Sequence, residues 1–436
     1  MFKLKKNSSE EKIKKSKEII KEEKRKIKEE KKKIKSHTKK KPKKHIEKEI
    51  YTSKEVAISI VISMILGAVI CISAVLLTLK LNHVLDSYKD LSKLIETYKT
   101  ITNNYYGDID KKELIDTATN AMMESVGDNF TTYSNSEKTE SFLEDVEGSY
   151  EGIGCTVTTT EEGKIKVVSM FDDSPAKKAG LKENDIILAI DGTDYQDKTS
   201  NDVAEYVKNS KNKTITLKIK RNDKEKAIKI TRTKIDIPVV SSNLYEQDNH
   251  KIGYISISIF SKTATEQFKN QLEKLEKENI EGLVIDVRND GGGYLSSVTE
   301  ISNMFLAKGK VIYKLESEKE KEVIKDKTKE KRTYPIAILI NEDSASASEI
   351  LASAIKESYN GLVVGVNSYG KGTVQQTKQL KDGSMIKYTT QKWLTPNGNW
   401  INETGVEPTN KIELDTNGEN DNQLQEAIKL VVKKLN

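Results

Sequence analysis

The chain divides into segments in which hydrophobic and polar positions follow different patterns. Residues 1–55 are almost entirely polar, and the next 24 residues, 56–79, carry no charge. At 1.5 Å per residue such a run forms a helix of roughly 36 Å, enough to cross a bilayer core of about 30 Å. The pattern predicts a basic segment at 1–55 and one transmembrane helix at 56–79.

The residues after the span change pattern three times. Residues 80–147 have apolar positions at helical spacing and predict a helical N-terminal region, whereas 148–235 alternate short strands with turns. Residues 236–415 combine apolar runs such as GLVIDVRN and YPIAILIN with helical stretches, which predicts a mostly parallel α/β core. Within it the charged stretch 317–334 predicts an exposed hairpin, and 416–436 predict a C-terminal amphipathic helix.

Charge is distributed unevenly. Residues 1–55 contain 23 Lys or Arg and 10 Glu, while the remaining chain is slightly acidic. So charged a segment cannot bury a core and is predicted to be disordered. Basic residues before a span favour the cytoplasmic side, which places the rest of the chain outside the cell membrane. A nucleic-acid-binding arm is the alternative use of this segment, and the adjoining span argues against it.

The span raises the question of a cleaved signal peptide. Signal peptides have apolar regions of about 7–15 residues followed by a small-residue cleavage site. This run is longer, and the following LTLKLNHVLD offers no such site, so an uncleaved anchor is expected. Of the two cysteines, Cys71 lies in the span and Cys155 lies far outside it, so no intramolecular disulfide is expected.

Residues 174–181 read SPAKKAGL and are followed by DIIL and by Asp191-Gly192. With these motifs, residues 148–235 resemble a PDZ domain. The segment Gly152-Ile153-Gly154-Cys155 resembles the family's carboxylate-binding loop, where glycines let backbone N–H groups converge on an anion. The strand that follows can accept a peptide as an added strand. A β-domain that binds no peptide is the alternative.

The residue types that are missing after residue 250 limit which catalytic groups the α/β region can use. All four histidines lie at or before residue 250, and residues 251–436 contain neither His nor Cys. A Ser-His-Asp triad or a Cys-His pair therefore cannot form within this region. The sequence shows no HExxH motif or Cys/His cluster with metal spacing, so no metal or cofactor is expected. A base for hydrolysis must be Lys or a carboxylate.

One glycine-rich stretch, GVNSYGKG at 365–372, is close to the phosphate-binding pattern GxxxxGK[ST]. However, position 372 is Gly and lacks the hydroxyl that binds Mg²⁺. The residues that follow alternate as in a strand, whereas a phosphate loop needs a helix N-terminus there. The pattern disfavours a nucleotide site.

A serine hydrolase with a lysine base fits these residues better. Burial disfavours a charged lysine, so Lys371 between two glycines could be held neutral and accept a proton from a serine hydroxyl. The stretch SASASE at 344–349, at a predicted strand-to-helix junction, offers the nucleophile. The glycines at 291–293 offer backbone amides for an oxyanion. Composition alone does not choose among Ser344, Ser346 and Ser348.

Residues 95–415 contain a series of distinctive motifs, which in order are GSYEGIG before the PDZ-like region, DVRNDGGGYL, ILINEDSASASEILASAIKE, GVNSYGKGTVQ and YTTQKWLTPNGNWINETGVEP. With these motifs in this order, the region resembles the carboxy-terminal processing peptidases, the tail-specific proteases of peptidase family S41. The resemblance implies an α+β multidomain chain with the PDZ domain before a crotonase/ClpP-like protease core. It assigns five roles: Ser346 as nucleophile, Lys371 as base, Gln375 as the residue orienting that lysine, and the amides of Gly292 and Ala347 as oxyanion donors.

The resemblance also implies a membrane-anchored serine endopeptidase that cleaves exported proteins near their C-terminal tails. Its PDZ domain is expected to recognise the tail and to gate activity, and a homodimer through the helices at 81–147 or 421–436 stays open. One departure is at 288–293, where the family commonly reads R-N-N-P-G-G and this chain reads R-N-D-G-G-G. Another is Glu357, where many members carry Asp. A non-catalytic PDZ adaptor is the alternative, and it predicts peptide binding without turnover.

Overall fold

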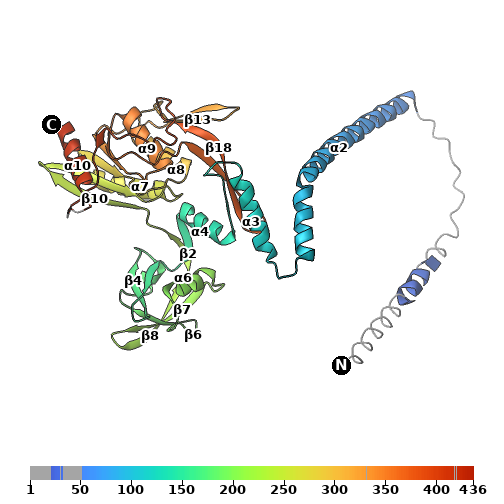
Figure 1. Cartoon of the computed structure of the whole chain (residues 1–436), viewed down its shortest axis with the longest axis horizontal. Helices are drawn as coiled ribbons and strands as arrows, with labels where there is room; N and C mark the ends of the chain where they lie inside the picture. The colour runs from blue at the N-terminus through green and yellow to red at the C-terminus, as the bar shows by residue number, and fades with distance from the viewer. Residues whose placement is uncertain (1–20, 30, 33–51, 330, 417, 419) are drawn as a thin grey trace. The chain divides into compact units, whose positions relative to one another are not determined.

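The computed structural model describes residues 21–29, 31–32, 52–329, 331–416, 418 and 420–436 (Figure 1). The chain forms two compact units, residues 1–108 and 109–436. The predicted disorder of residues 1–55 falls largely outside the described residues. Within that segment, 21–29 and 31–32 are helical and exposed.

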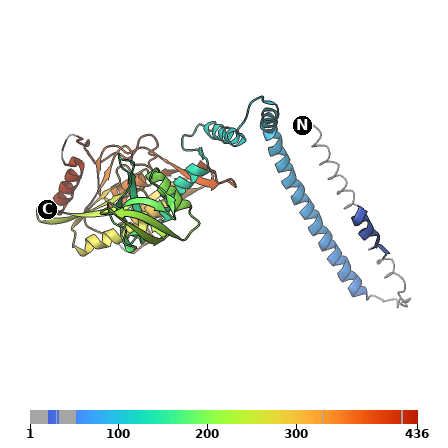
Figure 2. The same cartoon turned by 90° about the horizontal axis from the view of Figure 1, so that it is seen from below.

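The first unit contains α2 (Ser53–Asn104), a helix of 52 residues that runs without interruption (Figure 2). Its start is capped reciprocally: Glu55 N–H donates to Thr52 Oγ1, and Thr52 N–H donates to the Glu55 carboxylate. Its stretch Ser53–Val75 is long and apolar enough to cross a membrane. The predicted span and the first predicted helix after it form one helix, because neither Gly nor Pro occurs between residues 68 and 104.

The second unit begins with α3 (Lys111–Glu124), β1 (Thr132–Ser134) and α4 (Ser136–Glu147). A strand thus interrupts the predicted helical region 80–147. β1 pairs antiparallel with β18 (Met385–Leu394), some 250 residues later in the chain. A three-residue strand is too short to show a period of two, so the sequence pattern could not reveal it.

The region predicted as a PDZ domain is a small sheet with two helices. Its strand order is β3-β4-β5-β7-β8, with β6 against β5, and a separate ribbon joins β2 to β9. The elements are β2 (Ser149–Gly152), β3 (Cys155–Thr159), β4 (Ile165–Met170), α5 (Pro175–Lys178), β5 (Ile186–Ile190), β6 (Thr193–Asp194), α6 (Ser200–Asn209), β7 (Thr214–Arg221), β8 (Lys224–Thr231) and β9 (Thr233–Asp236). β3 is an edge strand beside α6, where Ser200 N–H donates to Thr159 Oγ1 at 2.8 Å.

The α/β region is built on a six-stranded sheet of order β10-β11-β12-β15-β16-β19. Its strands are β10 (Val240–Gln247), β11 (His250–Ile257), β12 (Gly282–Asp286), β15 (Ile336–Ile340), β16 (Leu362–Gly365) and β19 (Asn410–Lys411). β10 pairs antiparallel with β11, and every other pair is parallel, as predicted. All residues of β12 and β15 are buried, which explains their continuous apolar runs.

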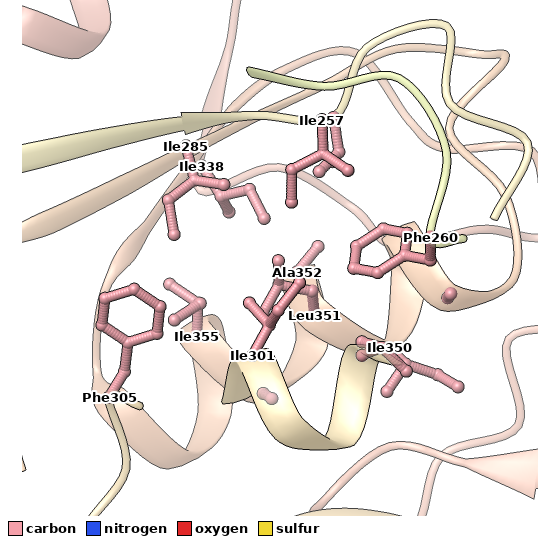
Figure 3. Close-up of a cluster of buried hydrophobic side chains, with 14 of the residues drawn as sticks. Ile257, Phe260, Ile285, Ile301, Phe305, Ile338, Ile350, Leu351, Ala352 and Ile355 are labelled. Carbon is pink, nitrogen blue, oxygen red and sulfur yellow. The ribbon is translucent and has the colours of Figure 1, made fainter. Parts of the chain in front are cut away.

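Helices cover both faces of this sheet. The helices are α7 (Ala264–Lys277), α8 (Leu295–Asn303), α9 (Ala347–Ala354) with a π-helical turn η1 (Ile355–Tyr359), and α10 (Asn422–Leu435). Figure 3 shows Ile285 and Ile338 of the sheet above side chains of α8 and α9, such as Ile301 and Leu351. The alternate residues of the same strands pack with α10, drawn in red in Figures 1 and 2. The core therefore fixes where β15 ends and α9 begins.

A second sheet contains β1, β18, β13 (Val311–Glu316) and β14 (Lys321–Lys325), with β17 (Thr373–Gln379) also paired to β18. β13 and β14 form a hairpin that begins before the predicted stretch 317–334: its turn and β14 lie within that stretch, whereas β13 precedes it. β17 and β18 form an antiparallel pair, which confirms the predicted strand after residue 372 and removes the helix that a phosphate-binding loop needs.

Gly365 tests the constraint at the end of β16. Its φ is +123°, and a Cβ would overlap the carbonyl oxygen of Ile340. We expect Gly365→Ala to lower the free energy of unfolding by about 3 kcal/mol or more, from backbone strain and overpacking together. Gly309 also has positive φ but no atom within 4 Å of a Cβ, so Gly309→Ala should cost about 1 kcal/mol. Urea unfolding of both variants checks this, and equal losses would contradict it.

Candidate active site

The SASASE segment joins β15 to α9, and its three serines have different environments. Ser344 is fully buried and its hydroxyl donates to the carbonyl of Val287 at 2.7 Å. Ser348 is also fully buried, and its hydroxyl donates to the carbonyl of Asp290 at 2.9 Å. Ser346 instead lines a cavity at the N-cap of α9, with φ of 57° and ψ of −109°. Positive φ is rare for a residue with a side chain, and such strain is concentrated at functional sites.

The cavity has a volume of about 600 Å³ and brings together segments that are distant in the sequence. It contains Ser346, Lys371 and Gln375, together with the glycine loop at 291–293. Its other lining residues are Phe142, Leu143, Val146, Ser258, Ile259, Tyr294, Leu295, Ser296, Thr373, Val374, Gln376, Thr377, Lys387, Gln391 and Trp393. Three of the predicted catalytic side chains therefore share one cavity.

Lys371 sits on a loop that only glycines allow. A Cβ on Gly370 would lie 2.9 Å from Thr404 N, and a Cβ on Gly372 would lie 2.8 Å from Asn402 N. The Lys371 carbonyl accepts a hydrogen bond from Trp393 Nε1 at 2.8 Å. Close backbone packing on both sides of the lysine thus holds its side chain away from bulk water.

Burial lowers the pKa of the Lys371 ammonium to about 8. The like charge of Lys387 acts in the same direction, while the carboxylates of Glu349 and Asp128 oppose it. Its Nζ lies 5.0 Å from the ring centroid of Phe130. Within the described ranges no hydrogen bond joins Nζ to the Ser346 hydroxyl, so the two groups must approach before a proton can pass. Catalytic hydrogen bonds are often long in the absence of substrate.

Glu349 connects the two loops that carry these side chains. Its Oε2 accepts hydrogen bonds from Ser346 N–H at 2.8 Å and from Lys371 N–H at 2.9 Å. Its Oε1 accepts from Ser368 Oγ at 2.6 Å and from Gly370 N–H at 2.7 Å. Burial raises the pKa of this fully buried carboxyl, and the four donors oppose the rise by favouring the carboxylate. One side chain therefore sets the spacing of both loops.

The sequence interpretation gave Glu349 no role. A signal was present, because Ser346 and Glu349 have the spacing of a helix capping box, S-x-x-E. That pattern explains the bond to Ser346 N–H, but nothing local indicates the bond to Lys371 N–H. The second contact depends on a loop that is 22 residues away in the chain.

Gln375 lies in the cavity but is not bonded to Lys371. Its Nε2 donates to Thr373 Oγ1 at 2.8 Å and to Thr389 Oγ1 at 3.1 Å. Thr389 in turn donates to Asp128 Oδ2 at 2.6 Å. In this arrangement Gln375 links β17 to β18. To orient the Lys371 amine, Gln375 would have to give up its hydrogen bonds to Thr373 and Thr389.

The glycine loop approaches the start of α9 closely. A Cβ on Gly292 would lie 2.9 Å from Ser346 Cβ and 3.0 Å from Ala347 N, so only glycine fits there. The two predicted oxyanion residues are thus adjacent in space. The Gly292 N–H, however, donates to Asp290 Oδ1 at 2.8 Å. In this structure the Gly292 N–H is therefore bonded within its own loop and does not point its hydrogen at an oxyanion position.

Asp290 is an ionisable group that the sequence interpretation did not single out. It is fully buried, and among the described residues its Oδ2 has no hydrogen-bond partner. Burial raises its pKa to about 8, although the bonds to Gly292 and Ser348 act in the opposite direction. An uncharged carboxylic acid therefore shapes the glycine loop at neutral pH.

The loop predicted to bind a peptide carboxylate lies between β2 and β3. Gly154 has φ of +71°, and a Cβ there would lie 2.6 Å from the Cβ of Ser174. The carbonyl of Ile153 accepts from Ala176 N–H at 2.9 Å. These contacts anchor the loop to α5 and leave β3 as the edge strand next to α6.

Comparison with known proteins agrees with this architecture. The sequence matches peptidase family S41 over residues 251–412, the PDZ domain over 152–231, and the activating protease CtpB N-terminal domain over 74–138. The carboxy-terminal processing protease CtpB of Bacillus subtilis (strain 168) is 40% identical over 333 residues, covering 75% of this chain and 69% of that protein.

Two further proteins are similar. A probable CtpA-like serine protease of Staphylococcus haemolyticus (strain JCSC1435) is 34% identical over 361 residues, covering 80% of this chain and 72% of that protein. The solved structure of the photosystem II D1 C-terminal processing protease aligns at 25% identity with a TM-score of 0.44, covering 74% of this chain and 86% of that one.

A PDZ domain joined to an α/β core of this kind defines a serine-type endopeptidase. The chain belongs to peptidase family S41 and is related to its carboxy-terminal processing proteases. The family resemblance and the fold class predicted from the sequence are confirmed.

The variant Asp290→Asn tests whether the buried Asp290 carboxyl is protonated near neutral pH. Because the folded chain retains a proton on Asp290 that the unfolded chain releases, the contribution of Asp290 to wild-type stability should fall as pH rises from about 4 to 8. The amide has no proton to lose, so the variant should gain at least about 1 kcal/mol relative to wild type between pH 5 and 8. Urea unfolding of the full-length protein in detergent, followed by Trp393 and Trp400 fluorescence, measures the difference. The exposed Asp343→Asn should follow wild type, and a parallel pH profile in Asp290→Asn would contradict the assignment.

Proposed function

We propose that this chain is a membrane-anchored endopeptidase in which Ser346 is the nucleophile and Lys371 is the general base. The observation that carries the proposal is that both side chains line one cavity. The serine is strained at a helix N-cap, and the lysine is desolvated. The backbone N–H groups of both residues donate to the same carboxylate, that of Glu349. The names of the bacterial relatives support the same reaction.

The reaction follows from these positions. A neutral Lys371 takes the proton of the Ser346 hydroxyl as the oxygen attacks a peptide carbonyl. Lys371 then donates this proton to the departing amine, which leaves an acyl-enzyme. A water molecule, deprotonated by the same lysine, hydrolyses the ester and restores the serine. With no histidine after residue 250, the basic groups that line the cavity are Lys371 and Lys387. Lys371 is the one whose backbone is bonded to the same carboxylate as the backbone of Ser346.

The negative oxygen of the intermediate needs preorganised donors. The Ala347 amide, at the N-terminus of α9, is one candidate, and the helix dipole there favours negative charge. The Gly292 amide is the second, provided that its N–H turns from Asp290 Oδ1 toward the substrate. Gln375 would orient the Lys371 amine after a similar exchange of partners. We propose that the Gly292 N–H and the Gln375 side chain both change partners when the substrate binds.

Recognition of C-terminal tails is the proposed role of the PDZ domain. A peptide can extend the sheet at the β3 edge, beside α6, and the loop Gly152–Cys155 lies at the start of that strand. Its backbone amides would receive the terminal carboxylate. This role agrees with relatives described as carboxy-terminal processing proteases. We propose further that occupancy of the PDZ domain gates cleavage.

The membrane arrangement also remains a proposal. Ser53–Val75 is apolar and fully exposed in the structure, as expected for a helix surrounded by lipid. The basic residues before it favour a cytoplasmic N-terminus. Residues 109–436 would then lie outside the cell membrane and act on exported or membrane proteins. The basic segment would serve topology rather than nucleic-acid binding.

Substitution of either catalytic side chain tests the mechanism. Ser346→Ala and Lys371→Ala should each reduce kcat for a peptide tail by at least about a thousandfold, since nucleophile or base is lost. Lys371→Arg should be equally inactive, because guanidinium does not deprotonate. The exposed Lys381→Ala is the matched control and should keep full activity. Mass spectrometry of the peptides measures turnover; a fully active Lys371→Arg would exclude a lysine base.

The pH profile tests the state of Lys371. Because the amine must be neutral to accept a proton, kcat/KM should rise with pH and reach half its maximum near the lysine pKa of about 8. Initial rates with one fluorogenic peptide across the range, corrected for stability at each pH, give the profile. A rate that is constant from about pH 6 to 9 is incompatible with this base.

A further inference from the structure

The lining of the catalytic cavity carries charge of one sign. Among the described residues that form it, the charged members are Lys371 and Lys387, and neither Asp nor Glu is present. The remaining residues are glycines, uncharged polar residues and apolar side chains from α4, α8, β17, β18 and the segment after β11. A peptide that enters therefore meets only cations among the charged side chains of the lining: both lysines when Lys371 is protonated, and Lys387 when it is neutral.

Lys387 has no function in the mechanism above. It is half-buried on β18, with Thr132 of β1 and Thr377 of β17 as its register partners. Its Nζ lies 5.7 Å from the ring centroid of Phe142 on α4. In the part of the chain that the structure describes, this ammonium forms no ion pair with a carboxylate.

Two nearby lysines have carboxylates in their surroundings. Lys392, on the same strand, lies 3.3 Å from the Glu316 carboxylate. Lys371 has the carboxylates of Glu349 and Asp128 within electrostatic reach. Burial lowers the pKa of Lys387, and no nearby acid opposes it. A half-buried cation without a counter-ion is under-solvated, so an incoming anion gains more there than at the surface.

We infer that Lys387 is an anion-binding subsite that selects a carboxylate of the peptide close to the bond being cleaved. The carboxylate is either an Asp or Glu side chain or the free C-terminus of the substrate itself. The site would favour these peptides by a charge-assisted hydrogen bond from Nζ. This inference rests on the proposed function, since it assumes that the peptide occupies the cavity beside Ser346.

Lys387 also influences the base electrostatically. The charged groups that face Lys371 are Lys387 from β18, Glu349 from α9 and Asp128 from the loop before β1. Loss of the like charge at 387 removes one of the causes that lower the pKa of Lys371. The pH at which kcat/KM is half-maximal should therefore move upward in Lys387→Met, which a merely structural residue would not cause.

The experiment uses the full-length protein in detergent and a set of otherwise identical fluorogenic peptides. One Asp or Glu is placed in turn at each position around the cleaved bond, with Asn or Gln as its uncharged match, and each peptide has a free or amidated C-terminus. We expect wild-type kcat/KM to favour the carboxylate at one position by about tenfold. Lys387→Met should abolish this preference, and Lys387→Glu should reverse it toward a Lys-containing peptide.

Lys392→Met is the matched control, because it removes a lysine from the same strand but outside the cavity, and it should keep the wild-type preference. If amidation of the peptide C-terminus removes the preference, the carboxylate bound by Lys387 is the C-terminus. If replacement of Asp or Glu by Asn or Gln removes the preference, the carboxylate bound is that side chain. A preference below about twofold at every position overturns the inference, as does one that persists in Lys387→Met. An amidation effect that persists there belongs to the PDZ loop and also counts against the subsite.

A second measurement separates this inference from the proposed function. Peptide affinity is measured by fluorescence anisotropy with Ser346→Ala, and again with Ser346→Ala combined with Lys387→Met. Carboxylate selectivity that disappears with Lys387 supports the subsite even if no peptide is cleaved by the wild type. Cleavage without such selectivity retains the endopeptidase mechanism and rejects the subsite. Thermal unfolding of Lys387→Met confirms that the fold is intact.

Discussion

The buried carboxylate of Glu349 is the contact on which the geometry of this site depends. It receives four hydrogen bonds, and two of them come from the backbones of the residues proposed as nucleophile and base. Ser346 ends a loop after β15, and Lys371 lies on a loop after β16, so neighbouring parallel strands deliver both to one edge of the sheet. The sheet brings the loops near each other, and the carboxylate fixes their separation. An ionised group with four donors in a dry site has little freedom to move.

Burial alters the pKa of two groups, Lys371 and Asp290, in a direction that suits the proposed reaction. It weakens the proton affinity of Lys371, so that a lysine can act as a base near neutral pH. It strengthens the proton affinity of Asp290, so that the glycine loop carries no extra negative charge where an oxyanion would form. Exclusion of water is the largest cause of the lowered pKa of Lys371, so a site with a lysine base in place of histidine depends strongly on staying dry.

Long apolar runs and specific motifs made much of the fold predictable. The apolar runs of β12 and β15, alternating with helical stretches, indicated a mostly parallel α/β core, and the charged insert indicated a hairpin whose turn and second strand, β14, lie within it. The motifs around Ser346 and Lys371 located the cavity. Three features escaped because they depend on tertiary contacts: the pairing of β1 with β18, the bond from Glu349 to Lys371 N–H, and the isolation of Asp290 from water. The sequence around a residue does not indicate which distant loop will pack against it.

The pairing of β1 with β18 has a consequence for how the protein can be divided. Residues 128–134 precede the PDZ domain in sequence, yet Thr389 donates to Asp128, and the Phe130 ring faces the Lys371 ammonium. The PDZ domain is therefore an insertion within the catalytic unit rather than a module placed before it. A fragment that begins at the PDZ domain would lack one edge of the second sheet and one wall beside the lysine. The smallest self-sufficient enzyme has to start upstream of Asp128, and the PDZ domain can be excised only as an internal loop.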